Sequence, residues 1–143
     1  MPKSTTFSND LAALIFNGDA IADIAENDTS GPLTNLYVSL HTADPGIAGS
    51  QLTNEAAYTN YAREPVARSG AGWTVSGGIA SNAAAIVFDT CGASGATITH
   101  VAIGTSLNGA GKVLWAGALN APLTVISGVI PTFGIGAIAT TEA

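Results

Sequence analysis

Turn-forming residues interrupt this chain at short intervals from residue 33 onward, and their spacing restricts the fold more than any other feature. Clusters of Gly, Pro, Asn and Ser separate short apolar runs. This pattern is typical of an all-β protein built as a β-sandwich, a jelly roll or a barrel. We expect a β-sandwich or jelly roll of about eight strands, near residues 34–41, 58–67, 72–75, 79–88, 97–104, 111–119, 122–127 and 134–140.

The first predicted strand has the clearest alternation of apolar and polar residues. Side chains of a strand point alternately to its two faces, so Leu36, Val38 and Leu40 share one face. We expect this face to point into the core, with the residues between them on the other side. The sequence Asp-Pro-Gly at residues 44–46 predicts the turn that follows.

The N-terminal segment predicts a short helix over residues 8–18. Ser8 or Asn9 can cap its free amides, and Gly18 can end it. Three apolar residues fall on one face that we expect to pack on the strands: Leu11, Leu14 and Ile15. We therefore divide the single domain into an N-terminal helix with an acidic arm, residues 1–32, and a β-sandwich, residues 33–143.

Charged residues are scarce and predominantly acidic. They make up 10% of the chain, against roughly 25% in average soluble domains. The formal net charge of −6 and the scattered positions of the four basic residues exclude a generic nucleic-acid binder and disfavour an anionic membrane surface. A protein surface with so few charged residues indicates an oligomer or a larger assembly, in which other copies or partner proteins cover part of that surface. A soluble monomer with a Thr, Ser and Asn surface is the alternative.

Targeting signals give little further information. The apolar runs are shorter than the roughly 18 residues that a membrane-spanning helix needs. The first residues lack the basic and then apolar order of a secretory signal, so we expect synthesis in the cytoplasm.

Reactive side chains are few, which argues against an enzyme. His41, Asp44 and one of the many serines could be imagined as a hydrolytic triad, but no Gly-x-Ser-x-Gly elbow nominates the serine. His100 lies in a different predicted strand. Cys91 is the single cysteine and has the acidic Asp89 nearby, so we expect it to be unreactive.

A metal site has one candidate, an acidic run in the N-terminal arm. Its spacing does not match the calcium-loop pattern, and we interpret it as a solvated arm. The run consists of Asp19, Asp23, Glu26 and Asp28. We accordingly expect no catalytic residue, no cofactor and no metal ion.

Three larger side chains have open roles. Trp73 and Trp115 are expected in the core, and stacking of an exposed Trp on a sugar ring is the alternative. Arg63 and Glu64 are neighbours in a predicted strand and should face opposite sides, so they do not pair with each other. We expect Arg63 to form an ion pair with another subunit.

A set of segments spread over nearly the whole chain resembles one known family. These segments follow the predicted N-terminal helix and precede a closing pair of apolar strands. They are residues 35–46 (Asn-Leu-Tyr-Val-Ser-Leu-His-Thr-Ala-Asp-Pro-Gly), 52–55 (Leu-Thr-Asn-Glu), 61–63 (Tyr-Ala-Arg), 81–83 (Ser-Asn-Ala), 99–104 (Thr-His-Val-Ala-Ile-Gly) and 111–119 (Gly-Lys-Val-Leu-Trp-Ala-Gly-Ala-Leu). The combination is similar to small virion proteins of tailed bacteriophages, some tail-fibre-like and others capsid cement or decoration proteins. The resemblance implies a β-sandwich or jelly roll without catalysis that assembles with other virion proteins.

Two positions in the virion fit this resemblance. Loops made of small residues and one compact domain favour a capsid decoration protein, located on the capsid surface and bound to the major capsid protein and to copies of itself. The alternative is a tail or tail-fibre component, whose loops would contact a host receptor.

Overall fold

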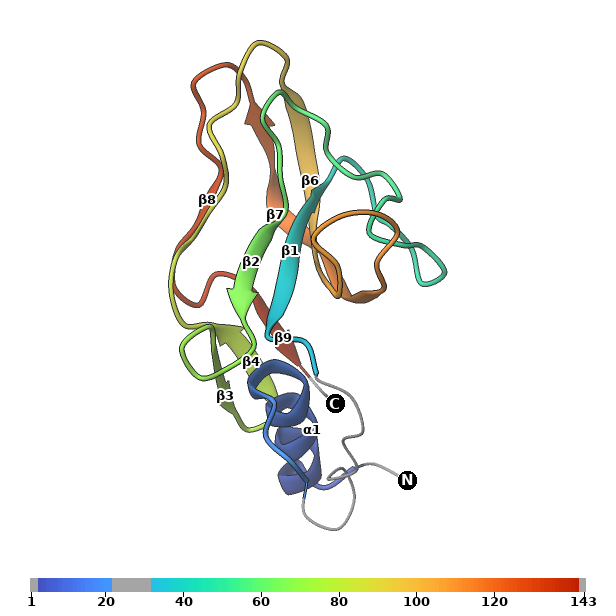
Figure 1. Cartoon of the computed structure of the whole chain (residues 1–143), viewed down its shortest axis with the longest axis vertical. Helices are drawn as coiled ribbons and strands as arrows, with labels where there is room; N and C mark the ends of the chain where they lie inside the picture. The colour runs from blue at the N-terminus through green and yellow to red at the C-terminus, as the bar shows by residue number, and fades with distance from the viewer. Residues whose placement is uncertain (1–2, 22–31, 142–143) are drawn as a thin grey trace. The chain divides into compact units, whose positions relative to one another are not determined.

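The computed structural model describes residues 3–21 and 32–141, and it is mostly β with one short N-terminal helix (Figure 1). The sheets have the strand orders β2-β1-β6-β7, β3-β4-β9 and β5-β8. The elements are α1 (Thr5–Asn17), β1 (Asn35–His41), β2 (Glu64–Ala67), β3 (Trp73–Ser76), β4 (Ile79–Asn82), β5 (Ile86–Val87), β6 (Ala96–Gly104), β7 (Val113–Val125), β8 (Thr132–Phe133) and β9 (Ala139–Thr141).

The chain forms two compact units, each assembled from separate segments. The first unit draws on residues 1–35, 66–86 and 133–143, and the second on residues 36–65 and 87–132. The expected division at residue 32 stays a prediction, because residues 22–31 lie outside the described part of the chain.

Helix α1 of the first unit begins earlier than the sequence suggested. The Ser4 side chain accepts a hydrogen bond from the Phe7 backbone amide at 3.1 Å, so Ser4 is the N-cap instead of Ser8 or Asn9. Gly18 ends the helix as predicted, in the left-handed conformation with φ of 75°.

The buried face of α1 also differs from the expected one. Ser8, Ala12 and Phe16 are buried, and the Phe16 ring contacts Trp73 edge to face at 4.6 Å between centroids. The three residues predicted to pack inward are only partly buried. Residues four positions apart lie on the same face of a helix, so Ser8, Ala12 and Phe16 share one face. This face is buried because Phe16 packs against Trp73 of β3.

Side-chain donors hold the irregular parts of the first unit. The Arg68 guanidinium donates to the carbonyls of Leu14 and Ile15, which have no partner within the last turn of α1. The buried Asn82 on β4 donates to the Gly134 carbonyl at 2.8 Å and accepts from the Ile138 amide at 2.9 Å.

The second unit is built on β1, β6 and β7, which lie side by side in Figure 1. Strands β1 and β6 are antiparallel, with Tyr37 opposite Gly104 and His41 opposite His100. Leu36, Val38 and Leu40 are buried, which confirms the predicted inward face.

The other face of β1 is covered as well near its end, so Ser39 and His41 are also fully buried. The reason is that residues 50–56 run along this end of the strand. The Ala56 amide donates to the Leu40 carbonyl at 2.8 Å, and the Thr42 amide to the Asn54 carbonyl at 2.8 Å.

Several predicted strands are shorter or broken, because turns formed by backbone hydrogen bonds interrupt them. Residues 58–61 form a turn with Asn60 at φ of 76°, so only residues 64–67 of the predicted 58–67 strand are β. Residues 83–85 separate β4 from β5. A turn closed by the Ala137 amide and the Gly134 carbonyl replaces most of the predicted 134–140 strand.

Strand β7 joins two strands that the sequence suggested to be separate. Ile98 of β6 lies opposite Leu123, whereas His100 lies opposite Ala118. Residues 119–122 of β7 therefore lie opposite the single residue Thr99 of β6, so β7 has three extra residues here, which form a wide irregularity in place of the predicted turn. Both halves of β7 stay paired with β6, one on each side of this irregularity.

The buried face of β1 makes a direct prediction for stability. Replacing Leu40, which is 0% exposed, with Ala should lower the free energy of unfolding by about 2–5 kcal/mol, since it removes buried methyl groups and leaves a cavity. Denaturant unfolding measures the change. The control Ile130→Ala, at a half-exposed position, should cost far less, and equal costs would contradict the assignment.

Candidate functional site

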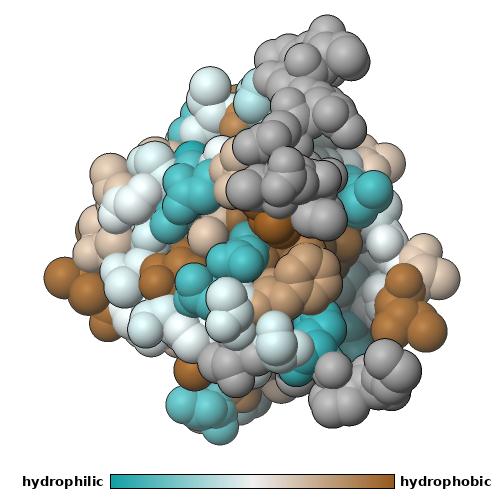
Figure 2. Space-filling view, turned by 90° about the horizontal axis from the view of Figure 1, so that it is seen from below, coloured by the Kyte–Doolittle hydropathy of each residue, from teal (hydrophilic) through white to brown (hydrophobic). Residues whose placement is uncertain are grey.

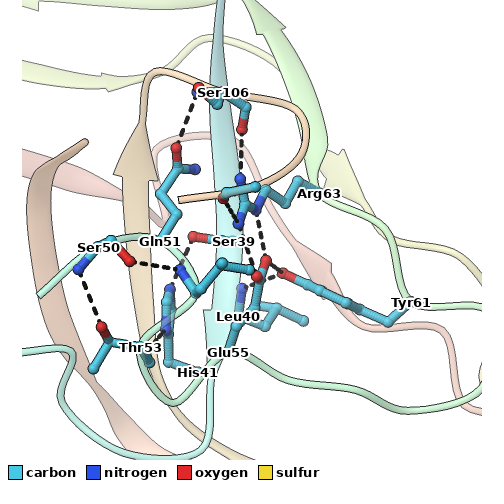
Figure 3. A network of polar contacts seen from close by, with 12 residues as sticks. Ser39, Leu40, His41, Ser50, Gln51, Thr53, Glu55, Tyr61, Arg63 and Ser106 are labelled. Atoms are coloured by element: carbon cyan, nitrogen blue, oxygen red, sulfur yellow. Dashed lines mark hydrogen bonds and ion pairs between the residues drawn. The ribbon is translucent and has the colours of Figure 1, made fainter. Parts of the chain in front are cut away.

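The polar residues that the sequence singled out lie inside the second unit, where they hold loops together. His41 is fully buried, with Nδ1 2.9 Å from the Thr53 carbonyl and Nε2 2.9 Å from Ser39 Oγ (Figure 3). The Thr53 carbonyl can only accept, so Nδ1 carries the proton and Nε2 accepts from the Ser39 hydroxyl. Burial lowers the pKa of His41, which favours this neutral form.

The structure does not assemble the imagined triad. Asp44 lies in the exposed turn, where its carboxylate accepts from the Gly46 amide at 2.8 Å. His100 has the Thr99 hydroxyl as its neighbour, 2.8 Å from Nδ1. Ser39 and His41 do form a pair, but both are buried, so a substrate has no access to them.

The metal-site candidate falls mostly outside the described residues. Asp19 is exposed, whereas Asp23, Glu26 and Asp28 belong to residues 22–31. Among residues 3–21 and 32–141, no three His, Cys, Asp or Glu side chains come close enough to hold a metal ion.

The remaining single candidates have structural positions. Cys91 is buried as a free thiol, 3.5 Å from the carbonyls of Gly92 and Ser94. Trp73 is fully buried, which confirms its place in a core. Trp115, on β7, is only partly buried, so it does not share the fully buried position of Trp73.

Arg63 corrects a prediction, because its partner lies within the chain. Its Nε and Nη2 atoms donate to the two carboxylate oxygens of Glu55 at 2.6 and 2.8 Å. The two side chains are only 3% and 12% exposed. The expected ion pair with another subunit is wrong, because the turn at residues 58–61 brings Arg63 back to Glu55.

The same guanidinium also holds a second loop. Arg63 donates to the carbonyls of Ser106 and Gly109, each at 2.8 Å, in the connection between β6 and β7. The hydrogen bond to Glu55 is the largest cause of a raised pKa for Arg63, so the group stays charged. We call Arg63, Glu55 and these two carbonyls the arginine clamp.

Tyr61 completes the arginine clamp from the side of β1. Its hydroxyl donates to Glu55 at 2.9 Å and accepts from the Leu40 amide at 3.1 Å (Figure 3). Burial is the main cause of its raised pKa, so the phenol stays protonated as this donor role requires.

Gln51 fixes the same two loops at a neighbouring point, and two glycines make room for it. Its side-chain oxygen accepts from the Ser106 amide at 2.9 Å. A Cβ atom at Gly104 or at Gly111 would lie 2.1 Å from an atom of the Gln51 amide group. Glycine is therefore required at both positions because the Gln51 side chain lies directly against the backbone there, and not because of an unusual φ angle.

Beside the arginine clamp lies an open groove of about 410 Å³. It is lined by residues 52, 55–58, 61–63 and 107–109. The side chains of Leu52 and Leu107 are 55% and 45% exposed. The guanidinium of Arg63 is bound to the Ser106 and Gly109 carbonyls of the clamp. Polar and apolar groups share the lining of this open groove. Because the Arg63 and Glu55 groups in that lining are already bound to each other, the groove suits contact with a partner better than catalysis, and it is the candidate interaction site.

Sequence reasoning missed the arginine clamp because its members are separated by turns. The signal that could have indicated it is the rarity of basic residues: Arg63 is one of four in 143 residues. An Arg in such a chain is a candidate for an internal role, with the nearby Glu55 as a possible partner.

Comparison with known proteins gives the family. A family model described as "Podophage GP4 fiber I protein gp80" matches residues 2–141. The chain belongs to this family. It is therefore a phage virion structural protein, and the family to which it belongs is tail-fibre-like by its description, in agreement with the resemblance seen in the sequence. No curated protein matches the chain.

Within the described residues, no helix has both the length and the apolar character needed to cross a bilayer.

The arginine clamp predicts that removing the charge of Arg63 strongly lowers the stability of the fold. Arg63→Met should lower the free energy of unfolding by about 3–5 kcal/mol, because it leaves Glu55 charged and largely buried without its partner. Denaturant unfolding measures the loss.

Two further variants separate this effect from loss of a positive charge in general. Lys112→Met removes an exposed charge and should change stability little. Adding Glu55→Gln to Arg63→Met should recover part of the loss, since no carboxylate then remains unpaired. Equal effects of the Arg63 and Lys112 variants would contradict the clamp.

Proposed function

We propose that this protein is a non-enzymatic subunit of the phage tail fibre or of its attachment to the tail. The family description, which matches nearly the whole chain, carries this proposal. It supports the tail alternative better than the capsid-cement interpretation.

The non-enzymatic part of the proposal is supported by how the described polar groups are used. His41, Arg63 and Glu55, which a catalytic site could have employed, are engaged in hydrogen bonds that join loops of the second unit. A catalytic group must reach a substrate and be free to react with it. His41 and Arg63 are buried, and the Glu55 carboxylate is occupied by hydrogen bonds from Arg63 and Tyr61.

Capsid decoration remains the second candidate. The small residues of the loops, which allow close approach of a neighbouring backbone, favour it. Under this alternative the major capsid protein would be the partner and the capsid surface the location. A two-layer sandwich or jelly-roll arrangement of the sheets is likewise a proposal, supported by the short antiparallel strands.

The two candidates differ in what particles lose without this protein. Particles made without it should package DNA and keep normal head stability, but adsorb poorly to host cells, because a fibre subunit acts in attachment. Adsorption rate and the temperature of DNA release measure the two properties. Supplying the intact chain from a plasmid should restore adsorption. Normal adsorption together with DNA release at lower temperature would overturn the fibre proposal in favour of decoration.

Strand β7 supports contact with further copies of this chain. Among the described strands β6 is its only neighbour in the sheet, so no described strand pairs with the other edge of this 13-residue strand. An unpaired edge without charge is a template for strand addition. Residues 113–125 contain no charged side chain, although the chain as a whole carries −6.

The two halves of β7 are not equivalent as edges. The irregularity at residues 119–122 and Pro122 protect the second half, because bulges and proline prevent further pairing. Residues 116–118, Ala-Gly-Ala, are exposed in the first half and allow close backbone approach. Antiparallel pairing of residues 113–118 with a second copy places neutral residues opposite one another, so the net charges of the copies meet least repulsion here.

The other exposed apolar residues are more dispersed. On the face shown in Figure 2, brown apolar residues reach the surface at several separate places between hydrophilic ones. Scattered apolar residues are ordinary on protein surfaces and indicate no particular partner.

Self-association through β7 predicts a specific effect of one lysine. The purified chain should associate in a concentration-dependent way, and Ala116→Lys should shift it toward monomer, since a charge on a free edge opposes pairing. Sedimentation velocity measures both. Ala48→Lys, at an exposed turn position, is the matched control and should behave like the unchanged chain. A purely monomeric chain, or equal behaviour of both variants, would contradict the proposal.

A further inference from the structure

The sequence contains two Asn-Gly steps, Asn17–Gly18 and Asn108–Gly109. In such a step the backbone nitrogen of the glycine can attack the side-chain carbonyl carbon of the asparagine. Glycine makes this attack easier than any other residue, because it has no Cβ to block the approach and it restricts the backbone least. The surroundings of each step decide whether the reacting atoms can meet.

The Asn108–Gly109 step is open to this reaction. Both residues are exposed, in the irregular connection between β6 and β7. Nothing lies within 4 Å of the position that a Cβ on Gly109 would occupy, so no other segment packs against this glycine on that side. In the described part of the structure, no hydrogen bond holds the Asn108 amide or the Gly109 N–H.

The Asn17–Gly18 step is held in place, although its sequence is the same. Asn17 is the last residue of α1, and the Gly18 N–H donates to the Ala13 carbonyl. The Asn17 side-chain amide is oriented with its nitrogen toward two backbone carbonyls, and it donates to that of Ser69 at 3.2 Å and to that of Trp73 at 3.1 Å. Attack therefore requires these hydrogen bonds to break first.

We propose that Asn108 is a site of spontaneous deamidation and that its modification loosens the arginine clamp. The Gly109 nitrogen forms a bond to Cγ of Asn108 and loses its proton, and ammonia leaves to give a cyclic imide. Water then opens the ring at either carbonyl. The products are aspartate, or isoaspartate whose backbone runs through Cβ and Cγ. The net change consumes one water and releases one ammonia, and no oxidant or reductant takes part.

Both products alter the candidate interaction site. Asn108 lines the groove, so either product places a new carboxylate on a wall that is otherwise uncharged at residues 107–109. The isoaspartate product also lengthens the backbone between Ser106 and Gly109. Since Arg63 is bound to the carbonyls of both residues, it cannot keep both hydrogen bonds in their present geometry.

Trypsin separates the two steps, which makes the test direct. Cleavage after Lys3, Arg63, Arg68 and Lys112 puts Asn17 in the peptide 4–63 and Asn108 in the peptide 69–112. The folded full chain is incubated at mildly alkaline pH, which favours the nucleophilic nitrogen, and the deamidated fraction of each peptide is followed by mass spectrometry. We expect peptide 69–112 to react at least about tenfold faster, because Asn17 reacts only after local opening.

Three controls make the outcome decisive. Urea-unfolded chain should deamidate in both peptides at similar rates, since the flanking structure is then lost. Asn108→Gln, whose attack would need a larger ring, should abolish the fast reaction in peptide 69–112. Asn17→Gln should leave that reaction unchanged. Equal rates for the two peptides of the folded chain, or persistence of the fast reaction in Asn108→Gln, would overturn the proposed site.

The loosening of the arginine clamp has its own readout. Aged chain separated by ion exchange should melt at a lower temperature when its peptide 69–112 contains isoaspartate. The variant Asn108→Asp adds the same charge without lengthening the backbone, and it should melt close to the unmodified chain. An unchanged melting temperature of the isoaspartate form would overturn this second part of the proposal.

Discussion

The buried ion pair between Arg63 and Glu55 is the interaction on which the second unit depends. Two charges taken out of water are stable there only if nearly every donor and acceptor has a partner. The fold meets this condition by bringing the Ser106 and Gly109 carbonyls and the Tyr61 hydroxyl to the pair. Two loops far apart in sequence are thereby fixed to the end of β1, and the groove beside them takes its shape from this arrangement.

The first unit uses the same physical solution with different residues. Arg68 binds the free carbonyls at the end of α1, and Asn82 binds the turn that precedes β9. Irregular backbone needs partners for its polar groups wherever water is excluded. In a chain with few aromatic residues for a large core, such side-chain bonds to the backbone keep long connections in defined positions.

Using both arginines internally has a consequence for the surface. Arg63 and Arg68 are half of the basic residues of the chain, so little positive charge is left to the outside. Two copies of this acidic chain then repel each other least where they meet through neutral strand edges, such as the first half of β7. The composition that looked unusual for a free monomer is thus consistent with the structural role that the family describes.

The sequence by itself determined the β-rich class, the presence of an N-terminal helix that ends at Gly18, the inward face of β1 and the family, because local alternation and turn residues report on short-range structure. It did not determine the strand breaks at Asn60 and residues 83–85, or the joining of both halves of β7 to one partner. These depend on which distant backbone groups are available for pairing. The partner of Arg63 likewise required the tertiary structure, because an ion pair forms where folding places the opposite charge, and sequence distance does not reveal that place.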